Sequence, residues 1–408
     1  MKNLNFSKIF IFGIFMTLCL VPGCVFAAVD VDTEDELKQA IVNGETEINL
    51  KDDIVLSTDV HSHASRSVGV NVKGEGTITI NGNGYTLSSP LVVAMEVRAN
   101  DGKNVKVVLN DITVTGVQRA IDIRSANVTL ELNNAKLNLT GSGNYQALTV
   151  GGSEGPITVD INNNSVIDGG KAGYGITTFN PVNMTIDNST VKGYAALYFK
   201  AADGSQGSAG SKITVASSIL EGNSRYSGYS DNFGTIVFED SGIEINIKDS
   251  VIKAVNTGTA YQVPFSLSET VTNVPEDEKI DITVEGNSEI IIDTQIDDES
   301  LVVNYDNTKM AVVVKAGVTS NVEIDEEYLE EGTQTIVNEN GIVTVVKPNA
   351  GGQVTPEKEP VKTDKENAKD TIENPETSDN ILVSIALASA SLVAIVGYVV
   401  YNKKRSYN

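Results

Sequence analysis

The chain is 408 residues long, has a formal net charge of −24 and contains 40% hydrophobic residues. So acidic a surface argues against nucleic acid and anionic lipid as partners. With no Trp and only two His, few imidazoles are present for acid–base chemistry, and only Tyr and Phe are left for stacking against sugars. The two cysteines, Cys19 and Cys24, lie in a segment that we expect to be removed, so no disulfide or metal–thiolate site is predicted.

Residues 1–27 are typical of a secretory signal peptide. Lys2 and Lys8 precede an uncharged apolar run, and a small-x-small pattern follows. Cleavage is predicted between Ala27 and Ala28. A lipoprotein-type signal that retains Cys24 is the alternative, although Pro22 fits that motif poorly. Either signal directs the chain out of the cell.

A short helix is predicted just after this segment. Thr33 is placed as the N-cap, Glu36 follows three residues later, and Leu37, Ala40 and Ile41 share one face. We expect this helix to close the N-terminal end of the domain that follows, because an open strand edge is a template for aggregation.

The middle of the chain repeats a unit in which an apolar residue is followed by two turn residues and a second apolar strand. The unit recurs every 23 to 37 residues, a period typical of solenoids. The units are Ile80-Asn81-Gly82, Leu109-Asn110-Asp111, Leu132-Asn133-Asn134, Ile161-Asn162-Asn163, Ile186-Asp187-Asn188, Val215-Ala216-Ser217, Ile247-Lys248-Asp249 and Val284-Glu285-Gly286.

Each unit reaches a further strand, and equivalent strands are expected to pair from one coil to the next. Asn, Asp and Gly at the third position of the unit tolerate the left-handed backbone that a corner requires, and we expect them to stack as a side-chain ladder. The further strands begin at Met95, Ile121, Leu148, Ile176, Leu197, Ile236, Phe265 and Leu301. Spacing and turn chemistry therefore predict an all-β fold, a single-stranded parallel β-helix of about eight coils.

The segment from Ile78 to Leu87, after the short helix and the strand at 47–50, resembles the opening coils of pectate-lyase-like right-handed β-helix proteins, especially their adhesin-like versions on bacterial surfaces. The resemblance implies a right-handed parallel β-helix domain over residues 28–347. Residues 310–346 are expected to close its C-terminal end, with a hairpin at 336–345.

The C-terminal segments predict attachment to a cell wall. Residues 348–373 are rich in Pro, Lys and Glu and are predicted to be a disordered spacer. An uncharged span at 381–402 is long enough for a transmembrane helix, and the basic tail 403–408 places its end in the cytoplasm. The order of motif, helix and tail resembles the sorting signal of sortase substrates, with the motif Asn374, Pro375, Glu376, Thr377 and Ser378.

The resemblance implies that sortase joins the chain to peptidoglycan at Thr377, so the membrane is a partner of the precursor only. Pro375 and Thr377 match the Leu-Pro-x-Thr-Gly pattern, whereas Asn374 and Ser378 depart from it, which leaves the sortase class open. The alternative is a single-pass membrane protein that carries the Pro-x-Thr by chance.

The repeat register supplies the candidate catalytic residues. It places Glu96 over Asp122 and Arg98 over Arg124 on the outer face of neighbouring coils. Such carboxylates could shift each other's pKa, and the two arginines could hold an acidic sugar. The alternative, which we favour, is a cross-coil ion ladder.

Metal and cofactor chemistry has little support in the sequence. Pectin-cleaving relatives act through Ca²⁺-binding aspartates with an Arg base, or through clustered aspartates, and their signature strings are not visible. Ca²⁺ is therefore the one cofactor that the resemblance leaves open. His61 and His63 could share a strand face but lack a third ligand, and an exposed loop is expected there.

Several tyrosines of the middle coils are candidates for a ligand-binding surface, and long loops at 201–210 and 221–234 flank them. We expect a displayed adhesin whose partner is a glycan or protein of a host or neighbouring cell. An anchored polysaccharide lyase or glycoside hydrolase and a passive stalk are the alternatives. The candidate tyrosines are Tyr174, Tyr194, Tyr198, Tyr226 and Tyr229.

Overall fold

The computed structural model describes residues 28–61, 66–152, 155–170, 172–201, 207–223, 233–255, 262–268, 271, 278–293 and 300–348. All of them fall in one compact unit, Met1–Gln353. The predicted signal peptide, sorting motif, transmembrane helix and basic tail lie outside these ranges, as do the spacer after Pro348, His63, Tyr226 and Tyr229. Within the described ranges, no helix is long and apolar enough to span a membrane.

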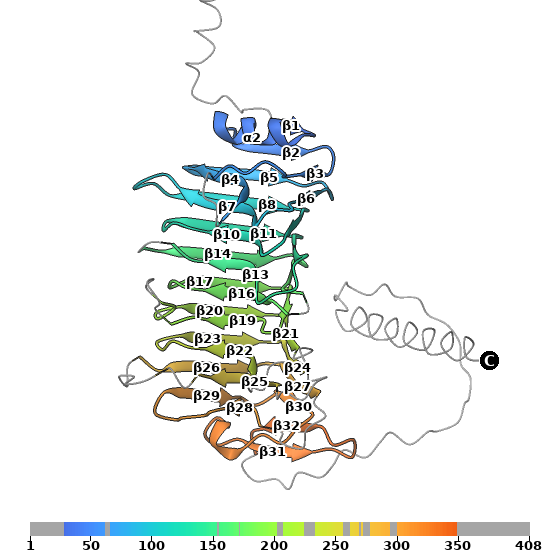
Figure 1. Cartoon of the computed structure of the whole chain (residues 1–408). Coiled ribbons are helices and arrows are strands. Elements are labelled where there is room, and N and C mark those ends of the chain that lie inside the picture. The colour runs from blue at the N-terminus through green and yellow to red at the C-terminus, as the bar shows by residue number, and fades with distance from the viewer. Residues whose placement is uncertain are drawn as a thin grey trace, which may run out of the picture. The chain divides into compact units, whose positions relative to one another are not determined.

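The chain winds through three parallel sheets in turn, one strand of each per coil (Figure 1). The first sheet contains β1 (Val29–Val31), β2 (Glu47–Leu50), β5 (Gly76–Asn81), β8 (Val105–Asn110), β11 (Val128–Asn133), β14 (Ile157–Asn162), β17 (Asn183–Asp187), β20 (Lys212–Ala216), β23 (Glu244–Lys248), β26 (Ile280–Glu285) and β29 (Met310–Val314).

The second sheet contains β3 (Ile54–Val55), β6 (Thr86–Ser88), β9 (Thr113–Gly116), β12 (Lys136–Leu139), β15 (Val166–Asp168), β18 (Thr190–Gly193), β21 (Ile219–Asn223), β24 (Val251–Val255), β27 (Glu289–Asp293), β30 (Thr319–Ser320), β32 (Val343–Val346) and β31 (Gln334–Val337). The third sheet contains β4 (Val68–Gly74), β7 (Val93–Ala99), β10 (Arg119–Ile123), β13 (Gln146–Val150), β16 (Tyr174–Thr178), β19 (Leu197–Phe199), β22 (Phe233–Phe238), β25 (Gln262–Leu267) and β28 (Val302–Val303).

Alternation of side chains fills the space between the sheets with apolar residues. In β11, for example, Val128, Leu130 and Leu132 are buried, whereas the residues between them are half-buried. Equivalent residues stack from coil to coil and form one continuous hydrophobic core. The predicted all-β parallel solenoid is therefore confirmed.

The predicted register of the first strands is confirmed along the whole repeat. The first residues of all eight units face one another in order: Ile80, Leu109, Leu132, Ile161, Ile186, Val215, Ile247 and Val284. In the third sheet the prediction is correct from Met95 to Phe265 and wrong at the last coil. There Phe265 pairs with Val302, not Leu301.

The corner after the first sheet uses a left-handed backbone, as predicted, at the third position of seven of the eight units, from Asp111 (φ 46°) to Gly286 (φ 70°). At the first unit the prediction is wrong, because Asn83 (φ 54°), not Gly82, takes that conformation. The main asparagine ladder also lies one residue earlier than predicted. The side-chain amide of Asn110 donates to Asn81 (2.9 Å) and that of Asn133 to Asn110 (3.0 Å).

The two ends of the column are closed by different elements. Helix α2 (Glu34–Asn43) is capped by Thr33, whose side chain accepts from the Glu36 N–H, and buries Leu37, Ala40 and Ile41, as predicted. At the other end β31 and β32 form the predicted antiparallel hairpin, next to the 3-10 helix η2 (Glu326–Tyr328). The hairpin ends the parallel stacking, because β32 runs antiparallel to β30.

Candidate functional site

Polar side chains line up on the outer face of the third sheet. The pairing of β4, β7, β10, β13, β16 and β19 places one residue of each strand in a single row that crosses the coils. The row consists of Asn71, Glu96, Asp122, Thr149, Thr177 and Tyr198. The predicted stacking of Glu96 on Asp122 is thus present.

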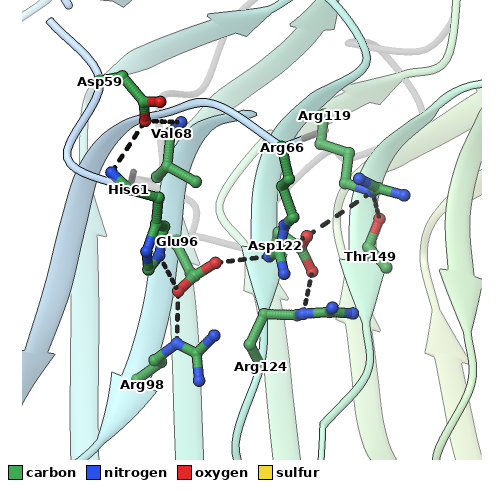
Figure 2. A network of polar contacts seen from close by, with 10 residues as sticks. All are labelled: Asp59, His61, Arg66, Val68, Glu96, Arg98, Arg119, Asp122, Arg124 and Thr149. Atoms are coloured by element: carbon green, nitrogen blue, oxygen red, sulfur yellow. Dashed lines mark hydrogen bonds and ion pairs between the residues drawn. The ribbon is translucent and has the colours of Figure 1, made fainter. Parts of the chain in front are cut away.

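Both carboxylates are fully buried although they point away from the core. Glu96 accepts from Arg98 Nε and lies 2.5 Å from Arg66 Nη2 (Figure 2). The same Arg66 nitrogen donates to Asp122 Oδ2 at 2.7 Å and so bridges the two coils. Arg119 Nε and Arg124 Nε lie 3.7 Å and 3.9 Å from the Asp122 carboxylate.

The segment before β4 brings two of these partners to the pair. Asp59 accepts from the N–H groups of His61 (2.9 Å) and Val68 (2.8 Å), which holds the two ends of this segment together. His61 Nε2 then lies 3.0 Å from Glu96 Oε1. The predicted loop is present at His61, but the side chain is only 33% exposed, because its ring contacts the buried Glu96 carboxylate.

The pKa values of the two carboxyl groups are shifted in opposite directions. Burial opposes the charge of Glu96, but hydrogen bonds from Arg98 and His61 and the charge of Arg66 outweigh it and hold its pKa below the usual value. Burial raises the pKa of Asp122, and the arginines around it offset this only in part. Glu96 is thus the firmly ionised member of the pair.

Four guanidinium groups face these two carboxylates, which gives a local surplus of positive charge in an acidic protein. The Arg98 and Arg124 side chains remain 33% and 38% exposed, so both can contact solvent or a ligand. Guanidinium groups bind carboxylates, sulfates and phosphates through two parallel N–H donors. The buried acids fix the arginines in place, and the outer guanidiniums can accept an anion.

The site does not fit Ca²⁺. That ion requires six to eight oxygen ligands, whereas the Glu96 and Asp122 oxygens already face guanidinium groups. Across the described residues, no group of three or more His, Cys, Asp or Glu side chains is placed to hold a metal.

Of the candidate tyrosines, the structure brings the rings of Tyr174, Tyr194 and Tyr198 together, next to Phe233. The repeat register did not identify Arg66, His61 or Arg119 as part of the carboxylate site. Arg119 lies three residues before Asp122 on the same strand, so its position in the sequence could have identified it. Arg66 and His61 come from outside the repeat, and no pattern in the sequence links them to Glu96 or Asp122.

Residues 28–135 match the family model described as "Putative pectate lyase-like adhesive domain". The matched segment contains every charged residue of the site, from Asp59 to Arg124. No curated protein matches the chain. Among solved structures, the crystal structure of pectate lyase Pel9A is similar, with 11% identity, a TM-score of 0.37, and coverage of 69% of this chain and 80% of that one.

Proposed function

We propose that this protein is a surface adhesin that binds an anionic ligand through the outer guanidinium groups of Arg98 and Arg124. The observation that carries the proposal is the set of four arginines fixed by two buried carboxylates within the segment that matches the adhesive-domain model. The acidic remainder of the surface repels anions, so specific capture requires such a local basic site.

Binding is favoured over catalysis by the state of Glu96. Both of its oxygens are engaged, Oε1 by Arg98 and His61 and Oε2 by Arg66, and its pKa is held low. A general base needs an oxygen within reach of the substrate proton and a pKa near the working pH. An active polysaccharide lyase, the second candidate, would release unsaturated products from an acidic polysaccharide, and no release across a broad substrate panel would exclude it.

Binding can be tested by applying the purified full-length chain to an array of sulfated, phosphorylated and uronic-acid polymers. Arg98→Gln and Arg124→Gln are each expected to weaken binding at least about tenfold, the loss of roughly one charge-assisted hydrogen bond. Lys212→Gln is the matched control. It removes the same charge from the first sheet, where the lysine is 71% exposed. A loss of binding in Lys212→Gln as large as that in the arginine variants would show non-specific attraction and contradict the proposal.

We further propose that the chain is exported and joined to peptidoglycan by a sortase at Thr377, as its sequence resembles a sorting signal from Asn374 to the basic tail. The wild-type protein should then leave the cell only after muralytic digestion, whereas Thr377→Ala should leave it extractable with detergent. Wild-type protein that detergent alone releases would rule out covalent attachment.

A further inference from the structure

A second group of apolar side chains lies outside the core, on the outer face of the third sheet. Tyr198 packs with Tyr174 and Phe233, with Tyr174 and Tyr198 ring centroids 4.9 Å apart, and this cluster is separate from the main core. Tyr194 stacks on Phe233 at 4.3 Å. Tyr174 and Phe233 are only half-buried, so the cluster reaches the surface.

Charged and hydroxyl groups border these rings. The Tyr198 hydroxyl donates to the Glu239 carboxylate, and Lys200 Nζ lies 2.6 Å from Glu239 and 4.6 Å from the centre of the Tyr198 ring. Burial, followed by the Glu239 hydrogen bond, raises the pKa of Tyr198, so its phenol stays protonated. Aromatic faces next to fixed donors and acceptors suit a ligand that has both apolar faces and hydroxyl groups.

Two polar atoms beside the cluster have no hydrogen-bond partner in the part of the chain that the structure describes. They are Thr177 Oγ1, on the strand that pairs with Tyr198, and Gln262 Oε1, on the strand that pairs with Phe233. Both side chains are at least 99% buried, and the Gln262 amide nitrogen donates to the Tyr194 carbonyl at 3.0 Å. Buried polar atoms are nearly always paired in folded proteins, so this unused capacity indicates a polar partner at the cluster.

The cluster and the arginine site share one row of the sheet. From Asp122 the row passes through Thr149 and Thr177 to Tyr198, three strand spacings away. At roughly 4.8 Å per spacing, the two sites are about 14 Å apart. Arg119 Nε donates to Thr149 Oγ1 at 3.2 Å and extends the basic site along this row.

We propose that the Tyr174–Tyr198–Phe233 cluster binds an uncharged sugar ring of the same glycan chain whose acidic group binds Arg98 and Arg124. The inference rests on the proposed function and makes its ligand more specific. The ligand is a linear glycan in which acidic and neutral sugars both occur, long enough to span about 14 Å along the coils.

The test compares two probes on the purified full-length chain by calorimetry. Hyaluronan oligosaccharides alternate acidic and neutral sugars, whereas oligogalacturonate is acidic at every sugar. Hyaluronan should bind more tightly. Tyr174→Leu and Phe233→Leu should each weaken its binding by about tenfold, the upper range for one aromatic contact, and change oligogalacturonate binding less than twofold.

Tyr305→Leu is the matched control, because this half-buried tyrosine forms a ring pair with Tyr328 at the C-terminal end, away from the row. Thermal unfolding of every variant shows whether it is folded. If only one of the two cluster variants folds, that variant alone is enough for the test. Unchanged hyaluronan binding in folded cluster variants, or equal losses for both probes, would overturn the inference. Losses confined to the arginine variants would overturn it while leaving the proposed function intact. Losses confined to the cluster variants would also overturn it, because the acidic group of the same glycan would then not bind Arg98 and Arg124.

Discussion

Glu96 and Asp122 occupy equivalent places in adjacent coils, yet their surroundings differ enough to give them different energetic roles. Glu96 makes contacts with three partners at normal or short hydrogen-bond distance. Asp122 Oδ2 accepts from Arg66, whereas Asp122 Oδ1 has no hydrogen-bond partner among the described residues. A buried carboxylate stabilises the fold only where hydrogen bonds and opposite charges exceed the cost of desolvation. We therefore expect Glu96 to stabilise the protein more than Asp122 does.

The corresponding prediction concerns unfolding free energy at pH 7. Glu96→Gln should lower it by about 3 kcal/mol, because it leaves Arg98 without its buried partner and Arg66 with Asp122 alone. Asp122→Asn should lower the unfolding free energy by a smaller amount. The pKa of Asp122 is raised on folding, so its contribution to stability falls as pH rises above about 3.8, the unfolded value. Glu96 acts in the opposite direction, and its contribution is lost as pH falls below about 4.5.

Urea titrations between pH 3 and pH 8 measure both effects. As pH rises, the unfolding free energy of Asp122→Asn should increase relative to that of the wild type. The unfolding free energy of Glu96→Gln should decrease relative to that of the wild type. A larger loss for Asp122→Asn than for Glu96→Gln at pH 7 would contradict the assignment.

Sequence reasoning located this pair but not its surroundings. Glu96 and Asp122 could be aligned because each lies at the same offset within its repeat unit. Their burial could not be foreseen, since it depends on Arg66 and His61, which reach the pair from a segment outside the repeat. Long-range side-chain contacts of this kind leave no periodic signal.

At the scale of the element, the corner after the first sheet is the feature that the sequence predicts best. The left-handed backbone there favours Asn, Asp and Gly, and these residues mark most of the corners. A column of buried serines follows the same corner and was not predicted. Within it the Ser218 hydroxyl accepts from the Ser189 N–H at 3.0 Å, and Ser250 does the same for Ser218 at 3.1 Å. Small hydroxyl residues in loops are too common for such a column to stand out in the sequence.

Ser217 and Ser218 allow a paired prediction for this corner. Ser217 has φ 48°, where asparagine is better tolerated, so Ser217→Asn should raise the unfolding free energy by about 0.5 kcal/mol. Ser218 is buried and caps the neighbouring coil, so Ser218→Asn should lower it by about 2 kcal/mol through lost hydrogen bonds and crowding. Denaturation midpoints measured at one pH provide the comparison. Changes of the same sign in both variants would show that backbone conformation does not control this corner.

For the molecule as a whole, stability should come mainly from contacts between neighbouring coils, because every parallel strand of the three sheets pairs with the equivalent strand of the next coil. A complete coil should then be removable. Residues 158–182 form such a unit, since Thr158 and Asn183 occupy equivalent positions in β14 and β17. Their deletion joins Ile157 to Asn183 and keeps Met184 and Ile186 on the buried face.

The deletion of 158–182 is therefore expected to give a folded column that is shorter by one coil, about 4.8 Å, with a cooperative thermal transition and an intact arginine site. A deletion of 158–181 differs by one residue and is the matched control. It shifts the register, so that Asn183 and Thr185 face the core in place of Met184 and Ile186, and it should prevent cooperative folding. Circular dichroism melts and small-angle scattering distinguish the two outcomes. Since residues 158–182 include Tyr174, the shortened protein should also lose the preference for hyaluronan over oligogalacturonate while still binding anions. A shortened protein that fails to fold would show that the coils depend on contacts beyond their neighbours.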